Sequence, residues 1–179
     1  MSQVPNKKEA FVQSFCRRVV PNARPQYVQL RPVVSEPVNE CFSIVPEQVA
    51  SHGGKQHIGW AIWVWPKVLI EAEFHTVWKS PDGGLVDITP KPVPLERILF
   101  VKDPGRQYEG VQVNNIRQPL NDDAQTLRFI ELADAVFVEL NHGDLADYHG
   151  HVEPTPRLME IMHEMEQLQM ALAERYGMP

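Results

Sequence analysis

Residues 41–89, CFSIVPEQVASHGGKQHIGWAIWVWPKVLIEAEFHTVWKSPDGGLVDIT, decide the fold. In the second half of this stretch, Leu69–Lys79 alternates between two faces, as a β-strand does. Ser80–Gly83 then places proline and glycine where tight turns prefer them. Gly84–Thr89 is a second, shorter strand candidate. This order predicts an antiparallel hairpin.

The register of this hairpin decides whether His75 and Asp87 meet. On antiparallel strands, the numbers of paired residues add up to a constant, and the two side chains share a face only if that constant is even. A sum of 162 pairs His75 directly with Asp87, and a sum of 163 places them on opposite faces. A sum of 164, which a three-residue turn at Pro81–Gly83 gives, makes them diagonal neighbours within contact distance.

Upstream of the hairpin, Asn39–Ala50 (NECFSIVPEQVA) has the pattern of a helix that two glycines end. Its start is open. If Asn39 is the N-cap, Pro46 lies inside the helix and forces a kink, because proline has no N–H to donate. If Ser43 is the cap, Pro46 lies in the first turn and Cys41 precedes the helix. Both starts are compatible with the sequence.

Cys41, His75 and Asp87 are the candidate catalytic residues. An imidazole can take the proton of a thiol, and the thiolate formed is a strong nucleophile. A carboxylate on the far ring nitrogen fixes the tautomer and stabilises the imidazolium. A helix N-terminus beside the sulfur favours the anion further. The chain order cysteine, histidine, aspartate therefore predicts thiol-dependent acyl transfer.

The segment FHTVWKSPDGGLVDITP resembles the second half of the transglutaminase-like and papain-like cysteine enzymes. In those enzymes a histidine opens an aromatic-rich strand, a turn follows, and an acidic residue lies on the next strand. His75-x-x-Trp78 and Asp87-x-Thr89-Pro90 are similar to that pattern, and Cys41 completes it upstream. The resemblance covers residues 39–90 and implies a cysteine nucleophile, a histidine base and an acidic orienting residue.

Four further residues are candidates for supporting roles, each with a structural alternative. The Asn39 amide is a candidate donor to an oxyanion, or a helix cap. Glu73 shares the predicted face of His75 and is a candidate partner for a substrate amine, or a solvated strand carboxylate. Trp60 and Trp78 are candidate walls of a substrate cleft, or parts of the core.

The remaining segments predict an α+β fold in one domain, 1–179, with the catalytic-like unit at 39–90. We expect an antiparallel sheet of about four to six strands, with the cysteine-bearing helix packed on it and a long C-terminal helix over residues 155–177. The other expectations are a helix at Glu9–Val20, an extended edge segment at Tyr27–Val34, strands at Gly59–Trp65 and Leu95–Val101, a long loop with one short strand at 102–123, and a helix or a strand within Ala124–Leu140.

Composition limits the classes of function. A net charge of −6 and the lack of a basic run argue against nucleic acid as a partner. No stretch is long and apolar enough to predict a membrane span, so we expect a cytoplasmic protein that does not bind membranes. Cys16 and Cys41 are expected to be thiols in that compartment. An apolar stripe on the C-terminal helix predicts a core contact or a homodimer seam.

Metal and cofactor chemistry is not predicted. His142, Asp144, Asp147, His149 and His151 gather in one polar segment, but their spacing fits no familiar zinc motif. The glycines form no phosphate loop. The function predicted from sequence is thus a cofactor-free hydrolase or acyltransferase that acts on an amide or thioester of a protein or peptide substrate. The alternative is a non-enzymatic protein-interaction module on a similar scaffold.

Overall fold

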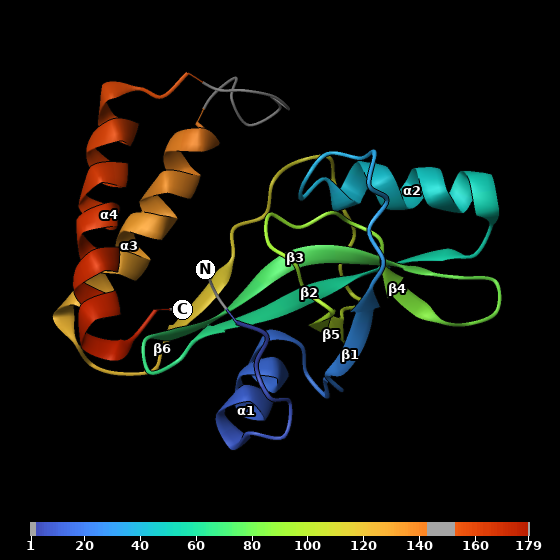
Figure 1. Ribbon diagram of the computed structural model, residues 1–179, viewed down its shortest axis with the longest axis horizontal. Helices are drawn as coiled ribbons and strands as arrows, with labels where there is room; N and C mark the ends of the chain where they lie inside the picture. The colour runs from blue at the N-terminus through green and yellow to red at the C-terminus, as the bar shows by residue number, and fades with distance from the viewer. Residues whose placement is uncertain (1–2, 143–152, 179) are drawn as a thin grey trace. The chain divides into compact units, whose positions relative to one another are not determined.

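The computed structural model describes residues 3–142 and 153–178 (Figure 1). Four helices and six strands are assigned within these residues. In chain order they are α1 (Ala10–Val19), β1 (Gln26–Leu30), α2 (Cys41–His52), β2 (Lys55–Trp65), β3 (Leu69–Lys79), β4 (Leu85–Asp87), β5 (Arg97–Lys102), β6 (Ile116–Pro119), α3 (Ala124–Leu140) and α4 (Pro156–Tyr176).

The strands form one sheet in the order β2-β5-β1-β4-β3-β6, and an additional pairing of β2 with β3 closes the first five into a barrel. The expected mixture of helices and strands is confirmed, as is the long C-terminal helix. The expectation of a purely antiparallel sheet was wrong, because β1 runs parallel to β4, with Gln29 opposite Val86 and Leu30 opposite Asp87. This pairing joins residues far apart in the chain and carries no local sequence signal.

The hairpin of β3 and β4 has the register that brings His75 toward Asp87. Trp78 pairs with Val86 and Lys79 pairs with Leu85, so the paired numbers add up to 164. The backbone N–H of Ser80 donates to the Gly84 carbonyl at 2.9 Å, which encloses a three-residue turn. The predicted diagonal register is therefore confirmed.

The two faces of this hairpin meet different neighbours. On one face, Val77 lies in a buried cluster with residues of β1, β2 and β5, and Leu85 packs against that cluster. On the other face, Trp78 and Val86 pack against Ile44 and Val45 of α2. Side chains alternate along a strand, so His75 and Asp87 lie on the face of Val77 rather than on the face that α2 covers. Figure 1 shows α2 lying next to β4.

The chain consists of two compact units. One contains Val4–Trp63 and Ala72–Tyr108, and so holds α1, α2 and most of the barrel. The other contains Met1–Gln3, Val64–Glu71 and Glu109–Pro179. In the second unit α3 and α4 lie side by side (Figure 1), joined by a bidentate contact of Arg128 with Glu164 at 2.7 and 3.0 Å.

Several local expectations can be compared with the structure. The helix at Glu9–Val20 is confirmed as α1, and Ala124–Leu140 is a helix throughout. The predicted edge position of Tyr27–Val34 was wrong: β1 pairs with β5 on one side and with β4 on the other, and it ends at Leu30, before Pro32. Among the residues that the structure describes, no helix is long and apolar enough to cross a membrane.

Candidate active site

Asp87 is the centre of a buried polar cluster. Its side chain is fully buried at the end of β4. One carboxylate oxygen, Oδ2, lies 3.0 Å from His75 Nε2, and the other, Oδ1, accepts the backbone N–H of Thr89 at 3.0 Å. Burial raises the pKa of Asp87, but the charge and hydrogen bond of His75, together with Lys91 and the Thr89 N–H, outweigh it and lower that pKa. Asp87 is therefore an ionised acceptor.

His75 lies on β3 with 1% of its surface exposed. Burial lowers the pKa of its imidazole, but the charges of Asp87 and Cys41 prevail and raise that pKa to about 10. With Nε2 directed at Asp87, the other ring nitrogen, Nδ1, is the one free for proton exchange. Nδ1 is buried and has no hydrogen-bond partner among the described residues. The ring is thus oriented by a carboxylate and unpaired at its second nitrogen.

Cys41 is the first residue of α2, and it is 4% exposed. The structure selects neither start considered from sequence: Glu40 is the N-cap, and Pro46 lies inside the helix. The first N–H groups of a helix have no partner within it and carry partial positive charge, and Cys41 lies at this end of α2. The backbone N–H of Asn39 donates to the Pro90 carbonyl at 3.1 Å, which holds the start of α2 beside the chain that follows Asp87.

An aromatic layer adjoins Cys41. Phe42 stacks on Phe74 of β3 with ring centroids 5.0 Å apart, and Tyr108 stacks on Phe42 at 4.1 Å. Burial raises the pKa of Tyr108, and the charges of Cys41 and Glu40 raise it further. The Tyr108 phenol therefore interacts electrostatically with the Cys41 side chain. Tyr108 was not a candidate from sequence, because it lies in a polar segment without periodicity.

Lys91 is a second residue that the sequence did not single out. Its Nζ lies 3.7 Å from Asp87 Oδ2, and its side chain is 4% exposed. Nζ has no hydrogen-bond partner in the described part of the chain, and neither does the buried Oγ1 of Thr89. The signal in the sequence was weak: Lys91 lies four residues after Asp87, between two prolines.

The two supporting polar candidates lie in different surroundings. Asn39 is exposed and has a backbone φ of 66°, in the left-handed region that asparagine tolerates. Its side chain does not cap α2, since no side-chain hydrogen bond caps that helix. The Glu73 carboxylate accepts the indole N–H of Trp63 at 2.6 Å. That bond orients Glu73 within the barrel.

The two tryptophan candidates also lie in different surroundings. Trp60 is 1% exposed, donates its indole N–H to Asp103 at 3.0 Å and contacts Phe74, so it is part of the core. Trp78 donates to the Gly53 carbonyl at 2.9 Å, at the end of α2 opposite to Cys41.

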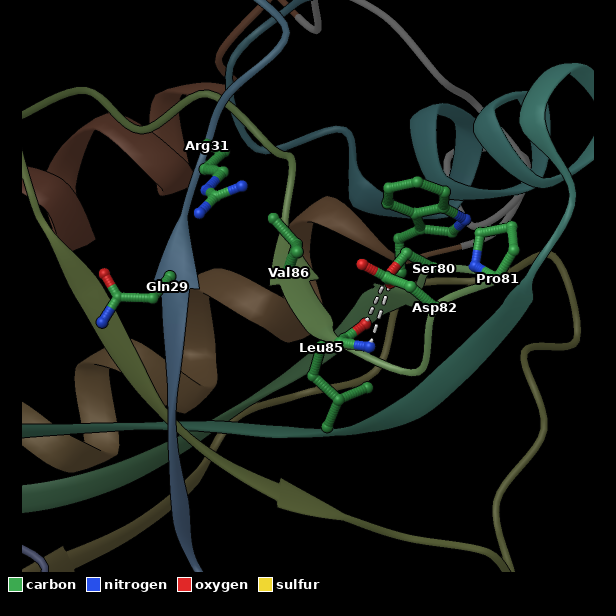
Figure 2. Close-up of a pocket in the computed structure, with 9 residues that line it drawn as sticks. Gln29, Arg31, Ser80, Pro81, Asp82, Leu85 and Val86 are labelled. Atoms are coloured by element: carbon green, nitrogen blue, oxygen red, sulfur yellow. Dashed lines mark hydrogen bonds between the residues drawn. The ribbon is translucent and has the colours of Figure 1, made fainter.

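Trp78 lines a groove of about 530 Å³ at the β3–β4 turn. Figure 2 shows Gln29 and Arg31 on one side of this groove and Ser80, Pro81 and Asp82 on the other. The Asp82 carboxylate accepts hydrogen bonds from the Ser80 hydroxyl and from the Gly84 N–H (Figure 2). These bonds stabilise the turn itself, and His75, Asp87 and Lys91 do not line the groove.

The remaining potential metal ligands and the second cysteine add no further site among the described residues. Within the described ranges, no group of three or more His, Cys, Asp or Glu side chains could hold a metal ion. Of the polar segment singled out above, Asp144, Asp147, His149 and His151 lie outside the described residues. Cys16 is a buried free thiol, and burial raises its pKa to about 11. No protein-family model, curated protein or solved structure matches this chain.

Proposed function

We propose that this protein is a cysteine-dependent hydrolase or acyltransferase, similar in its site to papain-like and transglutaminase-like enzymes. Cys41 is the nucleophile, His75 the general base and then acid, and Asp87 the residue that orients His75. The bond attacked is an amide or a thioester, and a protein or peptide is the substrate class. A cytoplasmic location, which we infer from the sequence, would keep the thiol reduced.

The observation that carries this proposal is that the two ring nitrogens of His75 have different environments. Nε2 is bound to Asp87 at 3.0 Å, and Nδ1 is buried without a partner among the described residues. Most buried polar atoms of a protein have a hydrogen-bond partner, so an unpartnered ring nitrogen calls for an explanation. A catalytic histidine is fixed through one nitrogen and exchanges a proton through the other. The thiol that interacts electrostatically with His75 is Cys41, at a helix N-terminus.

The proposed reaction proceeds in two stages. The Cys41 thiolate attacks the carbonyl carbon, and the resulting oxyanion is stabilised by N–H groups at the start of α2. When this tetrahedral species collapses, the bond to the leaving group breaks, and His75 donates its proton to a leaving amine or thiolate. The imidazole then takes a proton from water or from an acceptor amine, which attacks the thioester and releases Cys41. Water gives hydrolysis, and an amine gives transamidation.

The experiment that tests the proposal is alkylation by iodoacetamide, followed by mass spectrometry of the cysteine-containing peptides. A free thiol is only about 0.3% ionised at pH 6. We expect Cys41 to react at pH 6 at least about tenfold faster than such a thiol does, because an ion pair keeps the sulfur ionised. His75→Gln should remove this advantage. Cys16 is the internal control, since it is fully buried.

The result that would overturn the proposal is alkylation of Cys41 that rises with a single midpoint near that of a free thiol and is the same in His75→Gln. That result favours the second candidate, a protein-interaction module. The observation in favour of the module is the exposed methionines of α4, Met159, Met162 and Met170, because flexible methionines suit adaptable binding surfaces. A homodimer through α4 remains a prediction of the same kind.

A further inference from the structure

Lys91 is a buried cation whose anionic neighbour, among the described residues, is Asp87. Its side chain is 4% exposed, and its Nζ lies 3.7 Å from Asp87 Oδ2, the oxygen that also meets His75 Nε2. A distance of 3.7 Å is longer than a hydrogen bond. The N–H donors of Nζ have no acceptor among the residues that the structure describes. Lysine is rarely buried in this way, because removing an ammonium group from water costs several kcal/mol.

The chain holds Lys91 at this place through two prolines. Thr89 precedes Pro90, and Lys91 precedes Pro92. A residue before proline is confined to extended backbone. The chain bends at Thr89, just past the end of β4, and the Lys91 ammonium group lies 3.7 Å from Asp87 Oδ2. The two prolines restrict the backbone that carries the Lys91 side chain.

The net charge of the buried groups near Lys91 is zero only when the charge of Lys91 is included. In the described part of the chain, Lys91 interacts with Asp87 of β4 and with His75 of β3, and His75 in turn interacts with Cys41 at the start of α2. With thiol and neutral imidazole, Asp87 and Lys91 sum to zero. With thiolate and imidazolium, the four groups again sum to zero. Without Lys91, both forms carry a buried charge of −1.

We propose that Lys91 is a positioning residue of this site, which fixes the Asp87 carboxylate against His75 and sets the pH range over which His75 and Cys41 exchange a proton. The proposal rests on the proposed function, in which the proton transfer between His75 and Cys41 is a step of the reaction. Lys91 acts through Asp87 and does not touch the reacting atoms. Its positive charge keeps the imidazolium acidic enough to protonate a leaving group, whereas Asp87 alone would bind the proton too tightly.

The test is Lys91→Met, which keeps the length of the side chain and removes its charge. Loss of a buried positive charge favours protonation of its neighbours. We expect the pH at which His75 loses its proton, followed by ¹⁵N NMR of the imidazole, to rise by about one pH unit or more. The onset of Cys41 alkylation should move in the same direction. Lys91→Arg keeps the charge and should leave both midpoints near those of the unchanged protein.

A matched control is Lys102→Met at the exposed end of β5. Burial lowers the pKa of His57 and the charge of Lys102 lowers it further, so this variant should shift the titration of His57 and leave that of His75 unchanged. A lysine with a purely structural role gives another outcome, in which Lys91→Met lowers the urea midpoint but leaves the His75 and Cys41 midpoints in place. That outcome overturns the proposal.

The two proposals fail in different ways. If alkylation of Cys41 does not depend on His75, the proposed function is wrong, and the NMR titration still decides the role of Lys91. If Lys91→Met does not fold, Lys91→Gln and Lys91→Arg give the same comparison of a neutral and a charged side chain. Equal His75 midpoints in those two variants would also overturn the role of Lys91.

Discussion

Two ionic clusters of this protein differ in how completely their hydrogen bonds are made. In one compact unit, Arg117 contacts Glu71 at 3.3 Å and Asp134 at 2.8 Å. Asn114 and Asn115 add donors, at 3.0 Å to Asp134 and at 3.2 Å to Glu71. In the other unit, the cluster of His75, Asp87 and Lys91 leaves His75 Nδ1 and Lys91 Nζ without partners among the described residues.

The difference separates a structural network from a candidate active site. The Arg117 cluster is partly exposed and its groups bind one another, which is what a network that only holds elements together requires. The Asp87 cluster is buried, and unmade hydrogen bonds are costly there. Such a cost is characteristic of sites where a ligand or a reaction uses the free groups. Asn114, Asn115 and Arg117 thus belong to a satisfied network.

The largest expected effect comes from removing one carboxylate from each cluster. Asp87→Ala leaves the buried cation Lys91 uncompensated, and breaking a buried pair in this way costs about 3–5 kcal/mol. Asp134→Ala removes a half-exposed partner of Arg117 and should cost about 1 kcal/mol or less. Urea denaturation at pH 7 measures both free energies of unfolding.

A double variant sharpens this contrast. Asp87→Ala with Lys91→Met replaces the whole pair by apolar groups, and it should be more stable than Asp87→Ala alone. Equal losses in Asp87→Ala and Asp134→Ala would show that burial does not distinguish the two clusters.

The parts of the site that the sequence predicted are those that local rules determine. The three-residue turn at Pro81–Gly83 sets the register, and the register brings His75 diagonally opposite Asp87. The helix α4 was predictable for the same reason: the Thr155 hydroxyl accepts the Leu158 N–H, Pro156 follows in the first turn, and Gly177 ends it with φ of 92°.

The parts that the sequence did not predict depend on contacts between distant segments. The parallel pairing of β1 with β4 joins residue 29 to residue 86. No short turn connects the two strands, so no turn signal in the sequence predicts their pairing. The start of α2 at Cys41 lacks a capping side chain, so neither expected cap was found. Lys91 is expected in solvent by composition alone, and only the arrangement of Asp87 and two prolines explains its burial.

The second prediction concerns the pH dependence of stability. His75 has a folded pKa of about 10, above its ordinary value of 6.5, so its contribution is complete below pH 6.5 and is lost as pH rises toward 10. Between pH 6.5 and 8.5 the free energy of unfolding should fall by roughly 2 kcal/mol. Asp87 has a lowered pKa, so its contribution is present in this range and is lost only as pH falls through that pKa.

Guanidinium denaturation at several pH values measures this slope. His75→Gln should flatten it, because the titrating group is gone, while Asp134→Asn in the Arg117 cluster should leave it unchanged. The range ends at pH 8.5 because Cys16, with a pKa of about 11, adds a slope of its own at higher pH. A slope that persists in His75→Gln would contradict the assignment of this dependence to His75.

The smallest expected effect compares two buried threonine hydroxyls. Thr89 Oγ1, beside Asp87, and Thr126 Oγ1, on α3, are both fully buried and have no hydrogen-bond partner in the described residues. Replacing an unsatisfied hydroxyl by a methyl group removes a desolvation cost, so Thr126→Val should stabilise the protein by about 1 kcal/mol.

Thr89→Val should give a similar gain in stability, but it should also slow the alkylation of Cys41 at pH 6 by about two- to threefold. The reason is that Thr89 donates its backbone N–H to Asp87, so the loss of a buried dipole there should weaken the hold of Asp87 on His75. Thr126→Val, in the other compact unit, should leave alkylation unchanged. If both variants gain stability and neither changes Cys41, the hydroxyl of Thr89 is as inert as that of Thr126, and the active cluster reduces to the ionisable groups alone.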